Sequence, residues 1–69
     1  MLEVLDVVAL LQPRAELGLV RGQVGTVVER YSDDAVEVEF SDDDGVAYAL
    51  ASFRSGELLK LVHEAEVAA

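Results

Sequence analysis

The chain has 69 residues, which is enough for one small domain and too few for an active-site cleft between two domains. Hydrophobic residues make up 52% of the composition, which indicates a folded globule and argues against a disordered acidic tail. Asp and Glu number 14 against 5 Lys and Arg, and the resulting formal net charge of -9 disfavours binding to the phosphates of nucleic acid.

The first half of the chain predicts two strands separated by a long loop. Residues 5–11 form a short run of branched apolar residues that ends before Pro13, which favours a strand. Residues 12–23 combine Pro and Gly with charged residues and predict a loop, whose three apolar residues fold back onto the core. Residues 24–31 have the β-branched density of a second strand, and Gly25 near its start indicates a bulge or a close backbone approach.

The second half predicts a meander of short elements. Apolar and polar residues alternate through residues 36–40, which is typical of a strand with one buried face. The acidic turn at residues 42–45 ends in Asp-Gly and predicts a hairpin to a strand at residues 46–51. Residues 53–57 suit a single 3₁₀ turn, and residues 58–62 predict a last short strand.

These elements predict an all-β fold, a small five-stranded SH3-like antiparallel barrel with one 3₁₀ turn before the last strand. The barrel would cover residues 1–62, and residues 63–69 are predicted to be a frayed tail. A two-layer α+β fold and a domain-swapped dimer are the alternatives. The first strand is apolar on both faces, so we expect part of its surface to lie in an oligomer or partner interface.

The sequence also resembles known small barrels. The run from Gly18 to Glu29, GLVRGQVGTVVE, resembles the loop-to-strand signature of KOW-type and other SH3-like barrels. Together with the opening LDVVAL, the segment VEVEF, an acidic glycine turn and the closing ELLKLV, it is similar to a family of small bacterial SH3-like domains of unknown function. The resemblance implies a fold and names no activity. The chain departs from nucleic-acid-binding KOW proteins because this loop offers only Arg14 and Arg21 as basic residues.

We expect the glycines to serve turns and bulges and not to bind phosphate. A phosphate cradle needs a helix N-terminus directly after the glycines, and here a strand follows. The glycines predicted to serve turns and close contacts are Gly18, Gly22, Gly25 and Gly45.

Candidate chemistry is sparse. Asp33, Asp34 and the residues 42–44 could hold Ca²⁺ or Mg²⁺, but consecutive aspartates cannot all turn toward one ion, so solvated turns are favoured. His63 is the only histidine and there is no cysteine, so the sequence contains no nucleophilic triad and no set of nitrogen or sulfur ligands. We therefore expect no enzymatic activity, no cofactor and no metal.

The strongest functional signal is a predicted acidic sheet face that would steer a basic partner toward the domain. The residues predicted to contact a partner are Arg21, Glu29, Tyr31, Glu37, Glu39 and Tyr48. The sequence thus favours a non-catalytic interaction module that binds a basic protein through this face and the loop at residues 12–23, such as an antitoxin or immunity-type protein. The alternative is a structural homo-oligomer, most simply a two-fold dimer, or an accessory subunit; a KOW-like nucleic-acid binder is less favoured.

The predicted location is cytoplasmic. The N-terminus lacks the basic region of a signal peptide, and no apolar run reaches the length of a membrane span.

Overall fold

The computed structural model describes residues 1–62. These residues contain five antiparallel strands and two 3₁₀ turns, joined by loops. The elements are β1 (Val7–Leu10), the 3₁₀ turn η1 (Ala15–Leu17), β2 (Val24–Ser32), β3 (Ala35–Ser41), β4 (Ala47–Arg54), the 3₁₀ turn η2 (Ser55–Glu57) and β5 (Leu58–Leu61). This confirms the predicted all-β fold, with five antiparallel strands and a 3₁₀ turn before the last one. Neither turn approaches the length of a membrane span, and the described residues contain no other helix.

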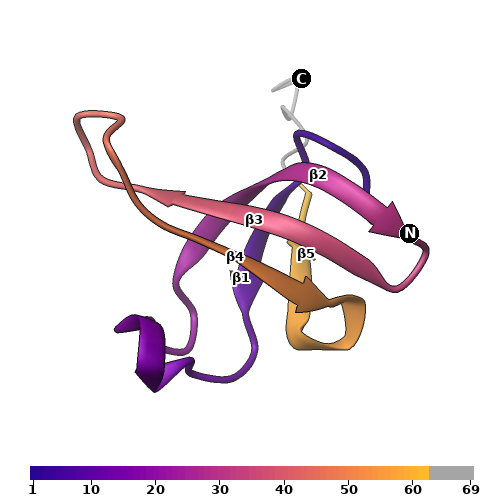
Figure 1. Cartoon of the computed structure of the whole chain (residues 1–69), viewed down its shortest axis with the longest axis horizontal. Helices are drawn as coiled ribbons and strands as arrows, with labels where there is room; N and C mark the ends of the chain where they lie inside the picture. The colour runs from indigo at the N-terminus through magenta and orange to yellow at the C-terminus, as the bar shows by residue number, and fades with distance from the viewer. Residues whose placement is uncertain (63–69) are drawn as a thin grey trace, which may run out of the picture.

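All five strands belong to one sheet, in the order β4-β3-β2-β1-β5. The sheet bends over itself, so that β1 and β5 cross behind β2, β3 and β4 (Figure 1). Within the bend, the last strand of the described residues, β5, pairs with the first, β1. Strand pairing does not close the predicted barrel, since β4 and β5 lie at the two edges of the sheet.

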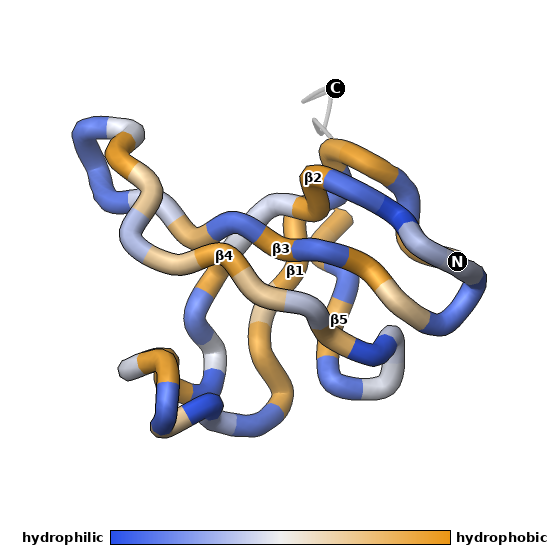
Figure 2. The backbone as a smooth tube through the Cα atoms, in the orientation of Figure 1, coloured by the Kyte–Doolittle hydropathy of each residue, from blue (hydrophilic) through white to orange (hydrophobic). Residues whose placement is uncertain are grey.

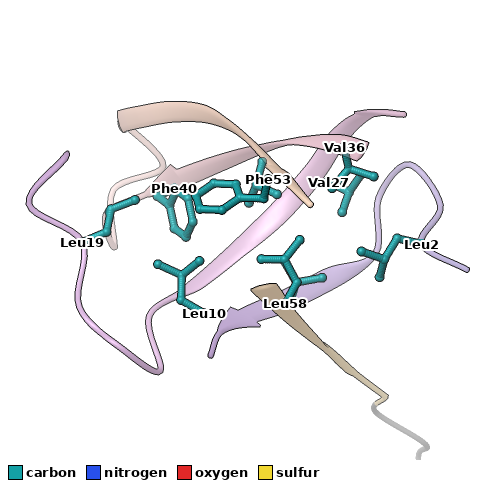
Figure 3. Close-up of a cluster of buried hydrophobic side chains, with 10 residues drawn as sticks. Leu2, Leu10, Leu19, Val27, Val36, Phe40, Phe53 and Leu58 are labelled. Carbon is teal, nitrogen blue, oxygen red and sulfur yellow. The ribbon is translucent and has the colours of Figure 1, made fainter. Parts of the chain in front are cut away.

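The core lies inside this bend, between the two halves of the sheet (Figure 3). It follows from alternation along the strands: in β3 every second residue is buried, and Figure 2 shows the same alternation in hydropathy. Phe40 and Phe53 meet edge to face with ring centroids 5.8 Å apart. The buried side chains are Leu2, Val8, Leu10, Leu19, Val27, Val36, Val38, Phe40, Phe53 and Leu58.

The largest differences from the predicted boundaries lie before β1 and between β4 and η2. The first strand begins at Val7, because a turn precedes it in which the Asp6 N–H donates to the Glu3 carbonyl at 3.1 Å. Leu5 takes a φ of 78° in this turn. The predicted 3₁₀ turn at residues 53–57 starts only at Ser55, since Phe53 still pairs with β3 and fills the core.

The long loop at residues 12–23 contains η1, which the sequence did not predict. Gly18 ends η1 with a φ of 71°, in the left-handed region that suits a residue without a Cβ. Of the three apolar residues expected on the core, only Leu19 is buried, whereas Leu17 and Val20 are exposed. The expectation that all three fold inward was therefore wrong, and Leu19 is the one apolar side chain that anchors the loop in the core.

The glycines divide into two kinds. Gly22 and Gly45 adopt φ values of 86° and 80° in turns, as Gly18 does in η1. Gly25 lies within β2 and is the predicted close approach: a Cβ placed there would lie 2.7 Å from Val38 Cγ1. The irregularities of β2 come later in the strand, beyond Val27. The prediction for residues 63–69 lies outside the described part of the chain.

Candidate protein-binding face

The outward face of β2 and β3 carries three glutamates. Because Val36, Val38 and Phe40 are buried, the residues between them in β3 point to the other side of the sheet. The pairing then aligns the acids: Glu29 lies directly opposite Glu37, and Glu39 lies opposite Thr26 of β2. Glu29, Glu37 and Glu39 form what we call the acidic strip.

Basic side chains pair with six carboxylates elsewhere in residues 1–62 and leave the acidic strip, like the turn at residues 42–44, without an ion pair. The ion pairs of residues 1–62 join Arg14 to Glu16 and Glu57, Arg30 to Glu3 and Asp33, Arg54 to Asp34, and Lys60 to Asp6. None of them reaches the acidic strip. The described carboxylates that form no ion pair are Glu29, Glu37, Glu39, Asp42, Asp43 and Asp44.

Neighbouring hydroxyl groups hold two of the three carboxylates of the acidic strip in place. Ser52 Oγ of β4 donates to Glu37 Oε1 at 2.9 Å, and Ser41 Oγ donates to Glu39 Oε1 at 3.2 Å. Partial desolvation raises the pKa of the Tyr31 phenol, and the charges of Glu37 and Glu29 raise it further. Tyr31 therefore lies within the field of the acidic strip, with about half of its side chain exposed.

The other two residues predicted to contact a partner lie elsewhere. Register shifts between Phe40 and Ser41, so that Tyr48 is an extra residue in β4, and its hydroxyl accepts a hydrogen bond from Gln23 Nε2. Gln23 Oε1 in turn accepts the Val20 N–H at 3.0 Å, so Tyr48 is tied to the end of the long loop. Arg21 is exposed in the turn just before Gln23. The structure groups Tyr31 with the acidic strip and groups Tyr48 with the loop.

Residues 4–60 match the model of the family described as "Domain of unknown function (DUF4926)". The chain belongs to this family. No curated protein and no solved structure matches it. The match covers β1 to β4 and most of β5, so the acidic strip and the long loop both lie within the boundaries of DUF4926.

The aspartate turns of this DUF4926 chain are separate from each other. Asp33 and Asp34 precede β3, and residues 42–44 follow it, so the two groups lie at opposite ends of the strand. The Asp42 carboxylate accepts the N–H groups of Asp44 and Val46, each at 2.9 Å, which is turn chemistry. Within residues 1–62 no three potential ligand residues are placed to hold a metal ion. His63 lies outside these residues.

Arg14 has a role that the sequence did not reveal. Its guanidinium carbon lies 4.8 Å from the centroid of the Phe53 ring, and its Nη1 lies 3.4 Å from the Ser52 carbonyl oxygen and 3.7 Å from Glu57 Oε2. It also donates from Nε to Glu16 at 2.8 Å, which lowers the pKa of that carboxyl. Arg14 thus connects the long loop to β4 and to η2. No local pattern marks this residue, because its partners are distant in sequence.

Proposed function

We propose that this DUF4926 chain is a non-catalytic SH3-like interaction module that binds a basic partner protein through the acidic strip and the loop at residues 12–23. The observation that carries the proposal is the lack of a basic partner for the acidic strip, which contains all the carboxylates of the five strands, whereas six carboxylates of the described turns and loops form ion pairs. The bent five-stranded sheet, with a 3₁₀ turn before β5, supports the SH3-like assignment.

The arrangement of charges supports binding and does not help folding. Glu29 and Glu37 face each other across neighbouring strands, and like charges at directly opposite positions destabilise a sheet. A basic side chain placed between them would relieve this repulsion only in the complex. The same uncompensated charge attracts a basic protein over distances of about a Debye length, which accelerates the encounter.

The long loop supports the proposal because it is held firmly beside the sheet. Arg14 and Gln23 connect it to β4, and Leu19 anchors it in the core. A loop fixed in this way loses little conformational entropy when it contacts a partner. Arg21, exposed at its end, provides a contact of opposite charge that helps to orient the partner.

The test is to purify the tagged protein from its own host at moderate salt and to identify what elutes with it. We expect a stoichiometric basic protein that is released as the salt concentration rises. The variant Glu37→Gln/Glu39→Gln should lose this protein. The variant Asp43→Asn/Asp44→Asn changes the net charge equally at side chains that form no hydrogen bond within residues 1–62, and it should retain the partner. Equal retention by both variants would contradict the assignment of the acidic strip.

An antitoxin or immunity-type role is the narrower form of the proposal, in which the basic partner is a toxin that the module neutralises. Co-expression of the partner with the chain should then rescue growth that the partner alone arrests. A partner that is harmless when expressed alone would exclude this form and leave the interaction module in place.

A structural homo-oligomer is the second candidate, and a different observation favours it. The outward residues of β5 and β1 are apolar, with Leu59, Leu61 and Val7 exposed, and pairing places Leu61 beside Val7 and Leu59 beside Ala9. A second copy would bury this surface. Sedimentation at micromolar concentration should then give twice the mass of one chain, and Leu59→Ser should return it to a monomer.

A further inference from the structure

We propose that the basic partner docks as an extended strand on the free edge of β4, antiparallel to it, with its basic side chains on the outward face beside the acidic strip. This inference rests on the proposed function and names the binding mode of the same face. It follows from three features: unpaired backbone groups, the orientation of a carboxylate, and the composition of β4.

The first feature is the row of backbone groups along β4. In an antiparallel pair, every second residue turns its N–H and C=O groups away from the neighbouring strand. The bonds at the end of β4 show which residues these are: the Ser52 carbonyl accepts Arg14, and the Arg54 N–H donates to Glu57 Oε1 at 2.8 Å. The backbone groups of Leu50, Ser52 and Arg54 therefore face the edge. The Leu50 N–H and C=O and the Ser52 N–H have no partner within residues 1–62.

The second feature is the position of the acidic strip relative to this edge. Pairing places Leu50 opposite Glu39 and Ser52 opposite Glu37, so one row of uncharged side chains separates the edge from the glutamates. The Ser52 hydroxyl holds the Glu37 carboxylate toward β4. An added strand would lie about 10 Å from β3, two strand spacings away. A lysine or arginine side chain crosses most of that distance and meets the carboxylate over Ser52.

The third feature is the weak protection of the middle of the β4 edge, between the bulge at Tyr48 and the Arg14 contact at the Ser52 carbonyl. Natural edge strands are short, or carry lysine, proline or inward-pointing charge, which prevents unwanted pairing. β4 has eight residues, and its only charged side chain is Arg54 at its end. The opposite edge, β5, has four residues with Lys60 among them. The edge that lies next to the acidic strip is thus the one open to a further strand.

The peptide test uses a fluorescein-labelled seven-residue peptide of alternating Lys and Val, with blocked ends. Two matched peptides carry N-methyl groups on the Lys residues or on the Val residues. In an antiparallel addition the residues that share a face with Leu50 direct their N–H groups to β4, so Lys methylation should weaken binding at least tenfold and Val methylation should not. Loss confined to the Val-methylated peptide would overturn the antiparallel orientation and indicate an added parallel strand. Equal affinity of all three peptides overturns it.

The matching change in the protein is Leu50→Pro. It removes an N–H that the β3 ladder does not use, which is the one kind of sheet position that tolerates proline. We expect the peptide affinity to fall at least tenfold and the unfolding midpoint to stay close to that of the wild type. A readout that needs no variant is amide hydrogen exchange: the N–H groups of Leu50 and Ser52 should exchange more slowly once the Lys-Val peptide is bound. Unchanged exchange at both residues overturns the proposal.

The outcomes separate this inference from the proposed function. Binding of oligolysine and of all Lys-Val peptides with equal affinity, sensitive to Glu37→Gln, would retain the acidic strip and reject strand addition. If no basic peptide binds at low salt, both are rejected. A chain that is dimeric without peptide, and that Leu50→Pro converts to a monomer, would show that a second copy occupies the β4 edge and would also reject the proposal.

Discussion

Glu29 of β2 and Glu37 of β3 lie directly opposite each other on the outward face of the sheet, with no basic side chain of residues 1–62 paired to either. Two like charges at this spacing oppose folding. A chain of net charge -9 carries this local cost in addition to its general self-repulsion. The relationship links the stability of the sheet to the charge that the proposed partner would neutralise.

Replacing Glu29 by Gln should stabilise the protein. We expect a gain of about 0.2–1 kcal/mol in the free energy of unfolding, because the substitution removes the repulsion from Glu37 and keeps the length of the side chain. Urea denaturation measures it. The gain should shrink when salt is added, since screening weakens the same repulsion in the wild type. A loss of stability would mean that Glu29 makes a favourable contact in the folded state.

The ionisation of Tyr31 reports on the same charges. Its pKa is raised above the ordinary value of 10.0, partly by Glu37, so Glu37→Gln should move the pKa back toward that value. Absorbance titration of the phenolate in a Tyr48→Phe background isolates the signal, and Asp43→Asn serves as the control. Because the folded state holds the proton more tightly, the stability associated with Tyr31 should be lost as the pH rises above 10.0. A Tyr31 pKa unchanged by Glu37→Gln would contradict the influence of the acidic strip on this phenol.

Gly25→Ala should destabilise the protein by about 1–3 kcal/mol, as overpacking does. The new Cβ would lie within 3 Å of Val38 Cγ1, of Phe40 Cε1 and of the Glu39 carbonyl oxygen, at 2.7, 2.8 and 2.9 Å. Backbone strain does not contribute, because the φ of Gly25 is not positive. Gly56→Ala is the control, since its Cβ would meet open space, and we expect a change within about 0.5 kcal/mol. Comparable losses in the two variants would contradict the crowding at β3.

Arg14→Met should cost about 1–2 kcal/mol, through loss of the contact with the Phe53 ring and of the bonds to β4 and η2. Arg14→Lys should recover only part of this, because an ammonium cannot reproduce the planar fork of a guanidinium. Arg21→Met makes the same charge change at an exposed residue without an ion pair in the described chain, and it should be nearly neutral. Thermal unfolding of the three variants ranks them, and an equal effect of Arg14→Met and Arg21→Met would refute the linking role.

Leu5→Gly should stabilise the turn before β1 by about 0.5–1 kcal/mol, since a leucine at a φ of 78° carries a steric cost that glycine avoids. Leu5→Ala retains a Cβ and should bring no such gain. The side chain of Leu5 is 76% exposed, so neither variant removes a core contact. Denaturant midpoints at equal protein concentration provide the comparison; a gain with alanine as large as that with glycine would indicate that the leucine side chain itself is unfavourable there.

The sequence predicted the strands well where side-chain alternation determines them. β3 is clearest, because its apolar and acidic residues alternate over its whole length and the register with β2 leaves the glutamates outside. The end of β4 was missed because Ser55 and Gly56 carry a strong turn signal, whereas Phe53 remains in the strand through its contact with Phe40. Tertiary packing overrode a local preference.

The candidate face could be predicted only in part. The acidic strip follows from the two-residue period, but the separation of Tyr48 from it depends on a register shift that no local pattern encodes. The engagement of Arg14, Arg30, Arg54 and Lys60 elsewhere is also set by tertiary structure. Composition alone gives the sign of the charge, and the fold decides where it stays uncompensated.

Because β1 pairs with β5, the sheet cannot be completed until β5 has left the ribosome. Contacts between consecutive hairpins allow β2, β3 and β4 to assemble as soon as they emerge, because little chain separates the partners. β1 emerges before the other four strands of the described residues but gains its second neighbour last, since β5 follows them all. Until then one backbone edge of β1 stays unpaired, and the nascent chain is most exposed to association or proteolysis during that interval.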